Sequence, residues 1–395
     1  MKLRGAAIAR LRKSLARHAR EGWTRAVFAR AGDDEASSQV LDGPGPGAPA
    51  TSVIDALLDA AEAAAREGRI KQTLVIDARR RVRIDARYGK AKVIELDETR
   101  ARKVMGGKDR ALRPDESANL LQVIGIMNAD GSISARSAKK YKQVNHFVEL
   151  CRPVWSKLVE QRAPTPEEPL RVLDLGCGNG YLDFVLAEAL RLAEVPVRLH
   201  GVDRRAELVE QCTARAQTLG FEAMSFSAGS IEEVELDETP LGGGPDLVVA
   251  LHACDTATDD ALALAIRTGA RSILAAPCCQ REVAEQLKGV DGETAKAVAP
   301  VSALVRSSLM RREYAAQLTD ALRVEVLEAC GYQVDAIEFV GSEHTPKNLM
   351  LRAHRRHASK DVDRSRWTLD AVGRRCEQLG VKPRLLSVLE MPPAD

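Results

Sequence analysis

A single glycine-rich turn constrains the fold of this 395-residue chain more than any other feature. The segment VLDLGCGNGYLDFVLAEAL (172–190) reads as an apolar strand that ends in an acid, followed by a turn and a helix. Gly176 lets the chain turn sharply, and Gly178 and Gly180 let the backbone approach a ligand because no Cβ stands in the way. The segment therefore predicts a ligand site just beyond the end of a buried strand.

The spacing of the glycines separates two kinds of ligand. Nicotinamide cofactors use G-x-G-x-x-G, whereas this turn is G-x-G-x-G and Tyr181 takes the place of the third glycine. Asp174, two residues before the first glycine, favours a cationic amino-acid ligand over a pyrophosphate. The spacing resembles the first motif of class I methyltransferases. That resemblance implies S-adenosylmethionine as cofactor, bound around Asp174, Gly176, Gly178 and Gly180.

The chain after residue 170 alternates between apolar strands and helices. Strands are predicted at 171–176, 198–203, 223–229, 246–253, 271–278, 332–340 and 348–355, and helices at 181–193, 204–219, 257–268 and 315–330. This order predicts an α/β fold, a mostly parallel sheet with helices on both faces. The closing strand pair resembles that of the Rossmann-like class I methyltransferase sheet, which implies an antiparallel last strand.

The second predicted strand supplies an independent check on the cofactor. It ends in Asp203, 23 residues after Gly180, where an acid is expected to hold ribose hydroxyls. The alternative is that Asp174 and Asp203 are ordinary turn residues at strand ends. Ser230 and Ile231, after the third strand, are expected beside the adenine.

Two short motifs follow the fourth and fifth strands. They are LHACD (251–255) and PCC (277–279), and both should face the transferred methyl because ligands bind beyond the carboxyl ends of such strands. With the K-K-x-x-Q segment (139–143), they resemble a methyltransferase-domain family. That family takes in ribosomal-RNA adenine dimethylase domain-containing proteins and the glutathione S-transferase C-terminal domain-containing protein, and it is similar more distantly to tRNA ribose methyltransferases.

The resemblance covers residues 137–355 and extends the expected cofactor site. It implies that Lys140, Gln143 and Leu251 contact the cofactor. The N/D-P-P-Y tetrapeptide of amino-directed adenine methyltransferases is absent, and LHACD stands in its position. Methylation of an exocyclic amine by that mechanism is therefore not expected.

His252 is the best candidate for a general base, because its ordinary pKa lies near neutrality. Asp255 is expected to orient it or to take the proton itself, and a structural histidine at a strand end is the alternative. Cys278 and Cys279 are candidate nucleophiles, or they pack around the cofactor. His252 and Cys254, together with these two cysteines, have side chains of the types that bind zinc. We expect no metal, because two adjacent cysteines rarely chelate one ion well.

The segment GSEHTPKN (341–348) separates the last two predicted strands. Thr345, Lys347 and Asn348 resemble a family motif in this region, which implies contact with the substrate. A plain hairpin loop is the alternative.

The region before residue 170 is predicted to be a separate accessory part. Residues 1–30 read as a basic helix, the Gly- and Pro-rich stretch 42–52 as a linker that is neither helix nor strand, and residues 72–98 as a small antiparallel sheet. The predicted organisation is an N-terminal helix with the start of a linker (1–41), a small α+β domain (42–130), the methyltransferase domain (131–358) and a C-terminal extension (359–395). One helix and a proline-ended tail are expected in that extension.

The charge of the chain is unevenly distributed. Residues 1–165 hold 32 Lys and Arg against 20 Asp and Glu, whereas residues 166–395 hold 26 against 36. A basic front half predicts contact with a polyanion, and we expect ribosomal or transfer RNA to bind there. Solvated helix faces are the alternative. The expected phosphate contacts include five arginines of the small sheet: Arg79, Arg80, Arg81, Arg83 and Arg87.

The remaining composition bears on location and on competing functions. The eight cysteines include no C-x-x-C pair, and no apolar run approaches the roughly 20 residues of a membrane helix, so a reduced, cytoplasmic protein is expected. An organelle transit peptide at the Arg-rich N-terminus is the alternative. Besides an RNA methyltransferase, the sequence allows a methyltransferase of a protein or small molecule, or a silent cofactor-binding scaffold.

Overall fold

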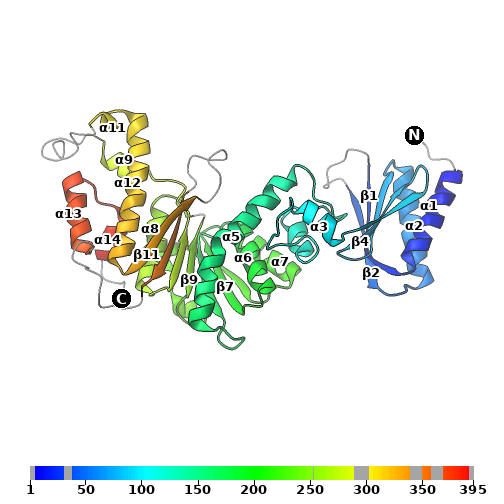
Figure 1. The fold of residues 1–395 in the computed structure, drawn as a ribbon, viewed down its shortest axis with the longest axis horizontal. Helices are drawn as coiled ribbons and strands as arrows, with labels where there is room; N and C mark the ends of the chain where they lie inside the picture. Colours follow the sequence, from blue (N-terminus) through cyan, green and yellow to red (C-terminus); the bar gives the residue numbers. More distant parts are fainter. Residues whose placement is uncertain are drawn as a thin grey trace. The chain divides into compact units, whose positions relative to one another are not determined.

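The computed structural model describes residues 5–30, 38–251, 253–288, 302–338, 349–356 and 368–390. The chain forms two compact units, Met1–His146 and Phe147–Asp395, here called the first and second unit (Figure 1). Helix α5 (Ser137–Arg162) runs from one into the other. The domain boundaries drawn from the sequence stay predictions.

The first unit contains a five-stranded antiparallel sheet in the order β2-β1-β3-β4-β5. Its main elements are α1 (Gly5–Ala19), β1 (Gly22–Ala29), β2 (Gln39–Pro46), α2 (Thr51–Arg66), β3 (Lys71–Val75), β4 (Arg80–Asp85) and β5 (Lys90–Glu95), followed by α3 (Glu98–Val104) and α4 (Ala118–Val123). Helices α1 and α2 lie on one face of the sheet (Figure 1). They bury Leu11, Leu15 and Leu57 against Trp23 and Phe28 of β1.

Two predictions about this unit are wrong. The helix expected over 1–30 ends at Ala19, and residues 22–29 form β1 instead. The stretch 42–52, expected to be neither helix nor strand, supplies most of β2 and the start of α2. Prolines are tolerated in β2 because it is an edge strand and its unpaired side needs no N–H donors. The small sheet expected over 72–98 is confirmed as β3, β4 and β5.

The second unit is built on a seven-stranded sheet in the order β11-β12-β10-β9-β6-β7-β8. The strands are β6 (Leu170–Leu175), β7 (Val197–Asp203), β8 (Met224–Ala228), β9 (Leu247–Ala250), β10 (Ser272–Ala275), β11 (Tyr332–Glu338) and β12 (Leu349–Arg355). Strands β6 to β10 pair in parallel, whereas β12 pairs antiparallel with both β10 and β11. This arrangement confirms the class I methyltransferase fold.

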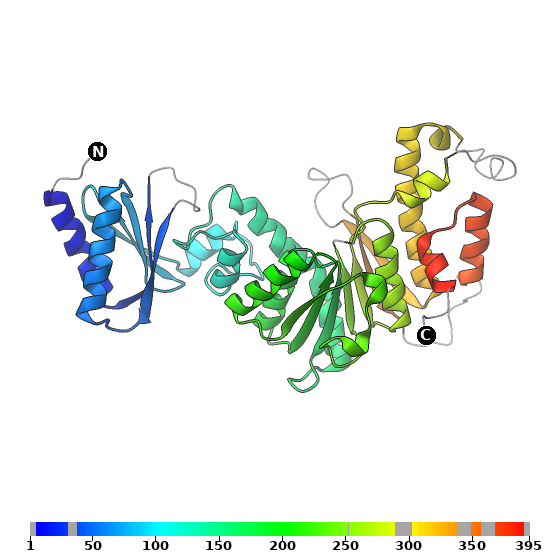
Figure 2. The same ribbon diagram turned by 180° about the vertical axis from the view of Figure 1, so that it is seen from behind.

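Helices cover both faces of this sheet (Figures 1 and 2). Beside α5 they are α6 (Tyr181–Leu192), α7 (Ala206–Leu219), α8 (Thr256–Arg267), α9 (Glu282–Gln286), α11 (Ser302–Arg306) and α12 (Ser308–Ala329). Strands β9 and β10 are entirely buried, as expected for a parallel sheet covered on both faces. Among the described helices, none has the length and apolar character needed to cross a membrane.

The end of the chain differs from its prediction. Instead of one helix, it contains α13 (Leu369–Leu379) and α14 (Arg384–Glu390). The second helix belongs to the core, because Leu385, Leu386 and Val388 are buried in the same cluster as α8. Arg384 also pairs with Asp260 of α8 at 2.8 Å. The sequence of α14 is too short to show a clear helical period.

Candidate active site

A cleft of about 490 Å³ opens at the carboxyl ends of the parallel strands of the second unit. Its lining comes from the loops after β6, β7, β8 and β9 and from the start of α8. The lining residues are Gly176, Val202, Asp203, Arg204, Arg205, Gly229, Ser230, Ile231, Glu232, Ala253, Cys254, Thr256, Ala257 and Asp260. This volume lies within the range of small-molecule and cofactor sites, about 300–1,000 Å³.

Asp203 lies at the end of β7, in the wall of the cleft. Its Oδ2 accepts hydrogen bonds from the main-chain N–H of Gly178 at 2.8 Å and from Arg205 Nη2 at 3.0 Å. Its Oδ1 accepts from Arg205 Nε at 2.9 Å and from the N–H of the same residue at 3.0 Å. Burial opposes ionisation of Asp203, but the bonds from Arg205 and Gly178 outweigh it and lower its pKa.

The three glycines of the turn serve different ends. Gly176 lines the cleft at φ 79°, where a Cβ would lie 3.3 Å from the nitrogen of Ala253. Gly178, at φ 61°, presents its N–H to Asp203. A Cβ on Gly180 would lie 2.9 Å from Sγ of Cys212, so the missing side chain there makes room for helix packing. The turn is thus shaped by the protein interior as well as by the cleft.

Asp174, one residue before the end of β6, lies beside a second buried acid, Asp183 of α6. Burial raises the pKa of Asp174 to about 6, although a hydrogen bond with Asp183 opposes the shift. Burial and the charge of Asp174 raise the pKa of Asp183 well above its usual range. Oδ1 of Asp174 is buried and accepts no hydrogen bond from the described residues. An unpaired buried carboxylate oxygen suits a cationic ligand group.

The other predicted cofactor residues are scattered. Ser230 and Ile231 line the cleft, whereas Leu251 is buried and does not line it. Lys140 and Gln143 are exposed residues of α5 within the first unit, and their contact with the cofactor stays a prediction. Four predicted catalytic or substrate residues lie outside the described part of the chain: His252, Thr345, Lys347 and Asn348.

Asp255 joins the loop after β9 to the loop after β10. Its Oδ1 accepts hydrogen bonds from the main-chain N–H of Arg281 at 2.8 Å and of Glu282 at 3.4 Å. Its backbone has φ 55° and ψ −123°, a sparsely populated conformation for a residue with a side chain. Such outliers cluster at functional sites. These contacts show that Asp255 holds the two loops together. The roles expected from the sequence, orienting His252 or taking the proton itself, stay predictions.

A buried charge network holds both loops from beneath. Arg323 of α12 is 2% exposed and binds both carboxylate oxygens of Asp259, at 2.7 and 2.9 Å. The same guanidinium donates to the carbonyl oxygen of Asp255 at 2.9 Å and to Asp320 at 3.0 Å. Asp320 in turn accepts from Gln280, in the loop after β10, at 3.0 Å. The sequence gives no signal for Arg323, because its main partner lies 64 residues away.

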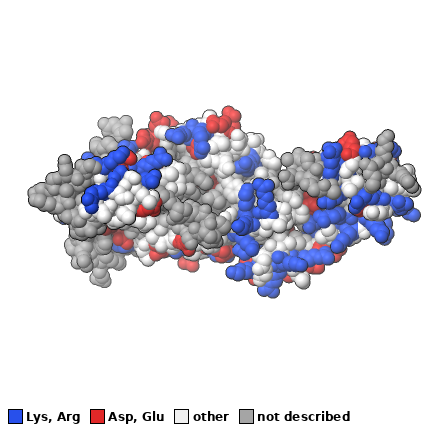
Figure 3. Space-filling model, turned by 90° about the horizontal axis from the view of Figure 1, so that it is seen from above, with Lys and Arg blue, Asp and Glu red and all other residues white. Residues whose placement is uncertain are grey.

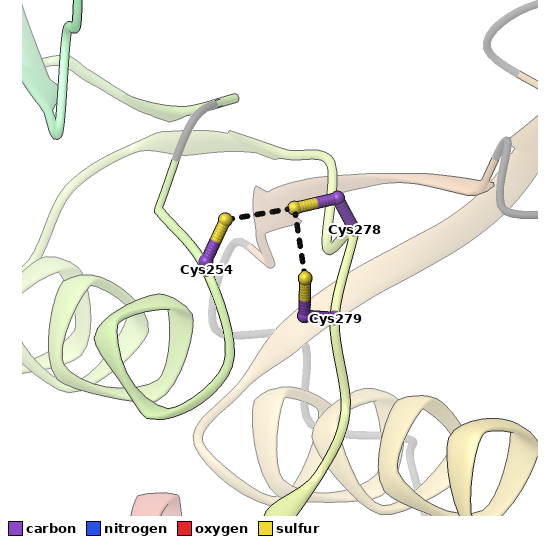
Figure 4. A group of neighbouring side chains, drawn as sticks. All are labelled: Cys254, Cys278 and Cys279. Atoms are coloured by element: carbon purple, nitrogen blue, oxygen red, sulfur yellow. Dashed lines mark hydrogen bonds between the residues drawn. The ribbon is translucent and has the colours of Figure 1, made fainter. Parts of the chain in front are cut away.

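Three cysteines converge where these two loops meet (Figure 4). Sγ of Cys278 lies 3.0 Å from Sγ of Cys254 and 3.6 Å from Sγ of Cys279. Cys254 also lines the cleft. Burial, together with hydrogen bonds with its two neighbours, raises the pKa of Cys278 to about 12. A thiol whose pKa is raised in this way is a poor nucleophile at neutral pH.

The fold and the cleft together define a class of protein: the second unit is a class I, S-adenosylmethionine-dependent methyltransferase domain. Comparison with known proteins agrees, since residues 139–286 match the model of a family described as a methyltransferase domain. The cofactor of this domain is S-adenosylmethionine. This match is to a methyltransferase domain in general. The expected relationship to ribosomal-RNA adenine dimethylase domain-containing proteins stays a prediction.

Particular relatives share only part of the chain. The glutathione S-transferase C-terminal domain-containing proteins of Homo sapiens and Macaca fascicularis are each 25% identical over 247 residues, which is 56% of this chain and 34% of theirs. The chain thus spans about a third of the length of these curated relatives.

Two solved methyltransferase structures with bound S-adenosylhomocysteine are also similar. Magnesium protoporphyrin IX methyltransferase from Synechocystis is 15% identical, with a TM-score of 0.32 over 60% of this chain and 93% of its own. A methyltransferase from Podospora anserina is 14% identical, with a TM-score of 0.34 over 67% and 99%.

Proposed function

We propose that this protein transfers a methyl group from S-adenosylmethionine to RNA, which binds through its phosphates to the first unit. The observation that carries the proposal is the exposed face of α1. Arg10, Lys13 and Arg17 are exposed and follow one another at helical spacing, and Arg20 continues the row just past the helix end. We call these four residues the α1 basic row. Helix α1 contains no acidic residue.

The surroundings of this row also suit a nucleic acid. A Cβ on Gly89 would lie 2.6 Å from Cβ of Arg10, so the turn between β4 and β5 contacts α1. That turn carries Tyr88, which is 57% exposed, and Lys90 and Lys92 follow on the edge strand. Cations next to an exposed ring provide phosphate contacts and a stacking surface. Lys and Arg predominate among the charged groups on the face of this unit that Figure 3 shows.

The five arginines expected to contact phosphates are poorer candidates than the α1 basic row. Each already has a partner in the first unit, which lowers the positive potential around β4. The pairs are Arg79 with Asp115, Arg80 with Glu21, Arg81 with the carbonyl oxygen of Asp130, Arg83 with Asp130, and Arg87 with Asp85. These partners come from distant segments as well as near ones, so the sequence could not reveal them.

The residues of the cleft fit the proposed cofactor. Asp203, in the cleft wall, offers carboxylate oxygens for ribose hydroxyls. Asp174, near the end of β6, does not line the cleft, but the unpaired Oδ1 of its buried carboxyl group suits an ammonium group. When bound, S-adenosylmethionine supplies an electrophilic methyl on a sulfonium. The chain would contribute alignment of the acceptor and, for a hydroxyl acceptor, removal of its proton. His252 stays the predicted base for that step.

A binding experiment with a matched control tests the RNA proposal. Changing Arg10, Lys13, Arg17 and Arg20 to Gln should lower affinity for labelled total tRNA at least tenfold, and the slope of log K against log salt should shrink by about 3. The control changes Lys288, Arg312, Arg374 and Lys382 of the second unit to Gln, which alters net charge equally. Equal losses in both variants would show nonspecific attraction only.

Labelled-methyl transfer separates RNA from the other acceptors. Total RNA and protein fractions from a strain lacking this protein should be offered in parallel, and label should appear in RNA. Label confined to protein would overturn the proposal, and cofactor binding without any transfer would favour a scaffold.

We also propose a reducing, cytoplasmic setting, supported by the eight free cysteines.

A further inference from the structure

The sulfur atoms of three cysteines beside the cleft lie close to one another. Sγ atoms of Cys254, Cys278 and Cys279 all lie within 4.8 Å of one another. Zinc–sulfur bonds of about 2.3 Å in a tetrahedral site put neighbouring sulfurs about 3.7 Å apart. The two close separations, 3.0 and 3.6 Å, lie near that value, so one ion can contact all three sulfurs with small side-chain adjustments.

The adjacent pair does not prevent chelation here. We expected no metal because two adjacent cysteines rarely chelate one ion well. In a strand, side chains of consecutive residues point to opposite faces. Both residues, however, lie beyond the end of β10 in irregular backbone, where their sulfurs are 3.6 Å apart. Figure 4 shows both sulfurs on the side of the loop that faces Cys254.

The loops that carry the sulfurs are fixed by contacts of their own. Asp255, next to Cys254, binds the main chain of the loop after β10, and Gln280, next to Cys279, binds buried Asp320. Arg323 connects these two contacts. A prearranged ligand set with supporting hydrogen bonds is what a metal site requires. The thiols are also accessible, since Cys254 and Cys278 are exposed and Cys279 is half-buried.

We propose that Cys254, Cys278 and Cys279 bind one zinc ion as thiolates, at the edge of the cofactor cleft. Three protein ligands leave a fourth position for water or a substrate atom, as in catalytic rather than structural zinc sites. The position of Cys254 in the cleft wall places the ion beside the methyl-transfer site. The proposal depends on neither RNA nor any other acceptor.

Metal titration of the full chain tests the site directly. Reduced protein, stripped with a chelator, should bind one zinc per chain in competition with a chromophoric chelator. Cobalt(II) should give a sulfur-to-metal charge-transfer band and the intense visible bands of a tetrahedral site. Each of Cys254→Ser, Cys278→Ser and Cys279→Ser should weaken zinc by more than about 100-fold, beyond the usual effect of an outer-shell partner.

Cys330→Ser is the matched control, because Cys330 is a half-buried free cysteine of the same unit outside the cluster. It should retain full zinc affinity. Circular dichroism and thermal unfolding should show that every variant is folded. Failure of the wild-type protein to bind zinc overturns the proposal. So does binding of one zinc per chain by a variant in which all three cysteines are changed to serine. A Cys254–Cys278 disulfide that forms in the presence of excess zinc overturns it as well.

Discussion

The main-chain N–H of Gly178 donates a hydrogen bond of 2.8 Å to Oδ2 of Asp203. This bond joins the turn after β6 to the end of β7, so the two sequence features that best predict the cofactor site support each other physically. Asp203 therefore has two tasks: it fixes the turn, and it presents carboxylate oxygens to the cleft. Its replacement should affect both.

Asp203→Ala should weaken S-adenosylhomocysteine binding by about 1.5–3 kcal/mol, the usual worth of hydrogen bonds to a charged group. The loss should exceed tenfold in affinity, measured by calorimetric titration. Asp237→Ala removes an exposed carboxylate of the same unit outside the cleft and should bind normally. Unchanged affinity in Asp203→Ala would show that the ribose is held elsewhere.

Arg205→Ala should raise the affinity for S-adenosylhomocysteine by about two- to fivefold. The Arg205 guanidinium binds both oxygens of Asp203 and must share or leave them when ribose hydroxyls bind. Because its side chain is 51% exposed, giving up this pair should cost only about 0.2–1 kcal/mol. Arg204→Ala, its neighbour in the cleft wall, is the matched control. Weaker binding in Arg205→Ala alone would mean that Arg205 contacts the ligand.

Cofactor affinity should depend on pH through Asp174. Its pKa is raised to about 6, so the carboxyl is mostly protonated at pH 5 and ionised at pH 7. S-adenosylhomocysteine, which carries an ammonium group, should bind about tenfold more tightly at pH 7 than at pH 5. Methylthioadenosine lacks that group and should show little change. A pH dependence that persists in Asp174→Asn would assign it to another residue.

The raised pKa of Asp174 also affects the stability of the folded protein. Rising pH should strengthen cofactor binding, but it should lower stability. A carboxyl whose pKa is raised by folding favours the folded state below its unfolded pKa, and that contribution is lost as pH rises through about 6. The raised pKa of Asp183 acts in the same direction. Without cofactor, the Asp174→Asn variant should therefore gain stability relative to wild type between pH 5 and 7. Chemical denaturation at several pH values measures the difference.

Arg323→Met should destabilise the second unit by about 3–5 kcal/mol, because it leaves Asp259 and Asp320 buried without their cationic partner. Arg312→Met, on the exposed side of the same helix, should change stability by less than about 0.5 kcal/mol. Denaturant unfolding compares them. Similar stabilities would mean that the buried acids are protonated and need no partner.

The sequence-based predictions that are confirmed depend on local patterns of residues. The alternation of strands and helices after residue 170 predicted the order of the elements, since a buried parallel strand must be apolar along its whole length. The glycine spacing and Asp203 predicted the cofactor by the same local logic. Strand β2 was missed because its glycines and prolines are tolerated only at a sheet edge, and edge position depends on distant pairing.

The sequence by itself determined the fold of the second unit, the cofactor class and the residues at the ends of β6 and β7, because each depends on neighbours within a few positions. Only the tertiary structure decided the partners that act across long separations. It paired Arg205 with Asp203, engaged the arginines around β4, and brought Cys254 within 3.0 Å of Cys278 from 24 residues away. Contacts of this kind depend on which strand ends meet at the edge of a sheet, and that is settled only when the sheet assembles.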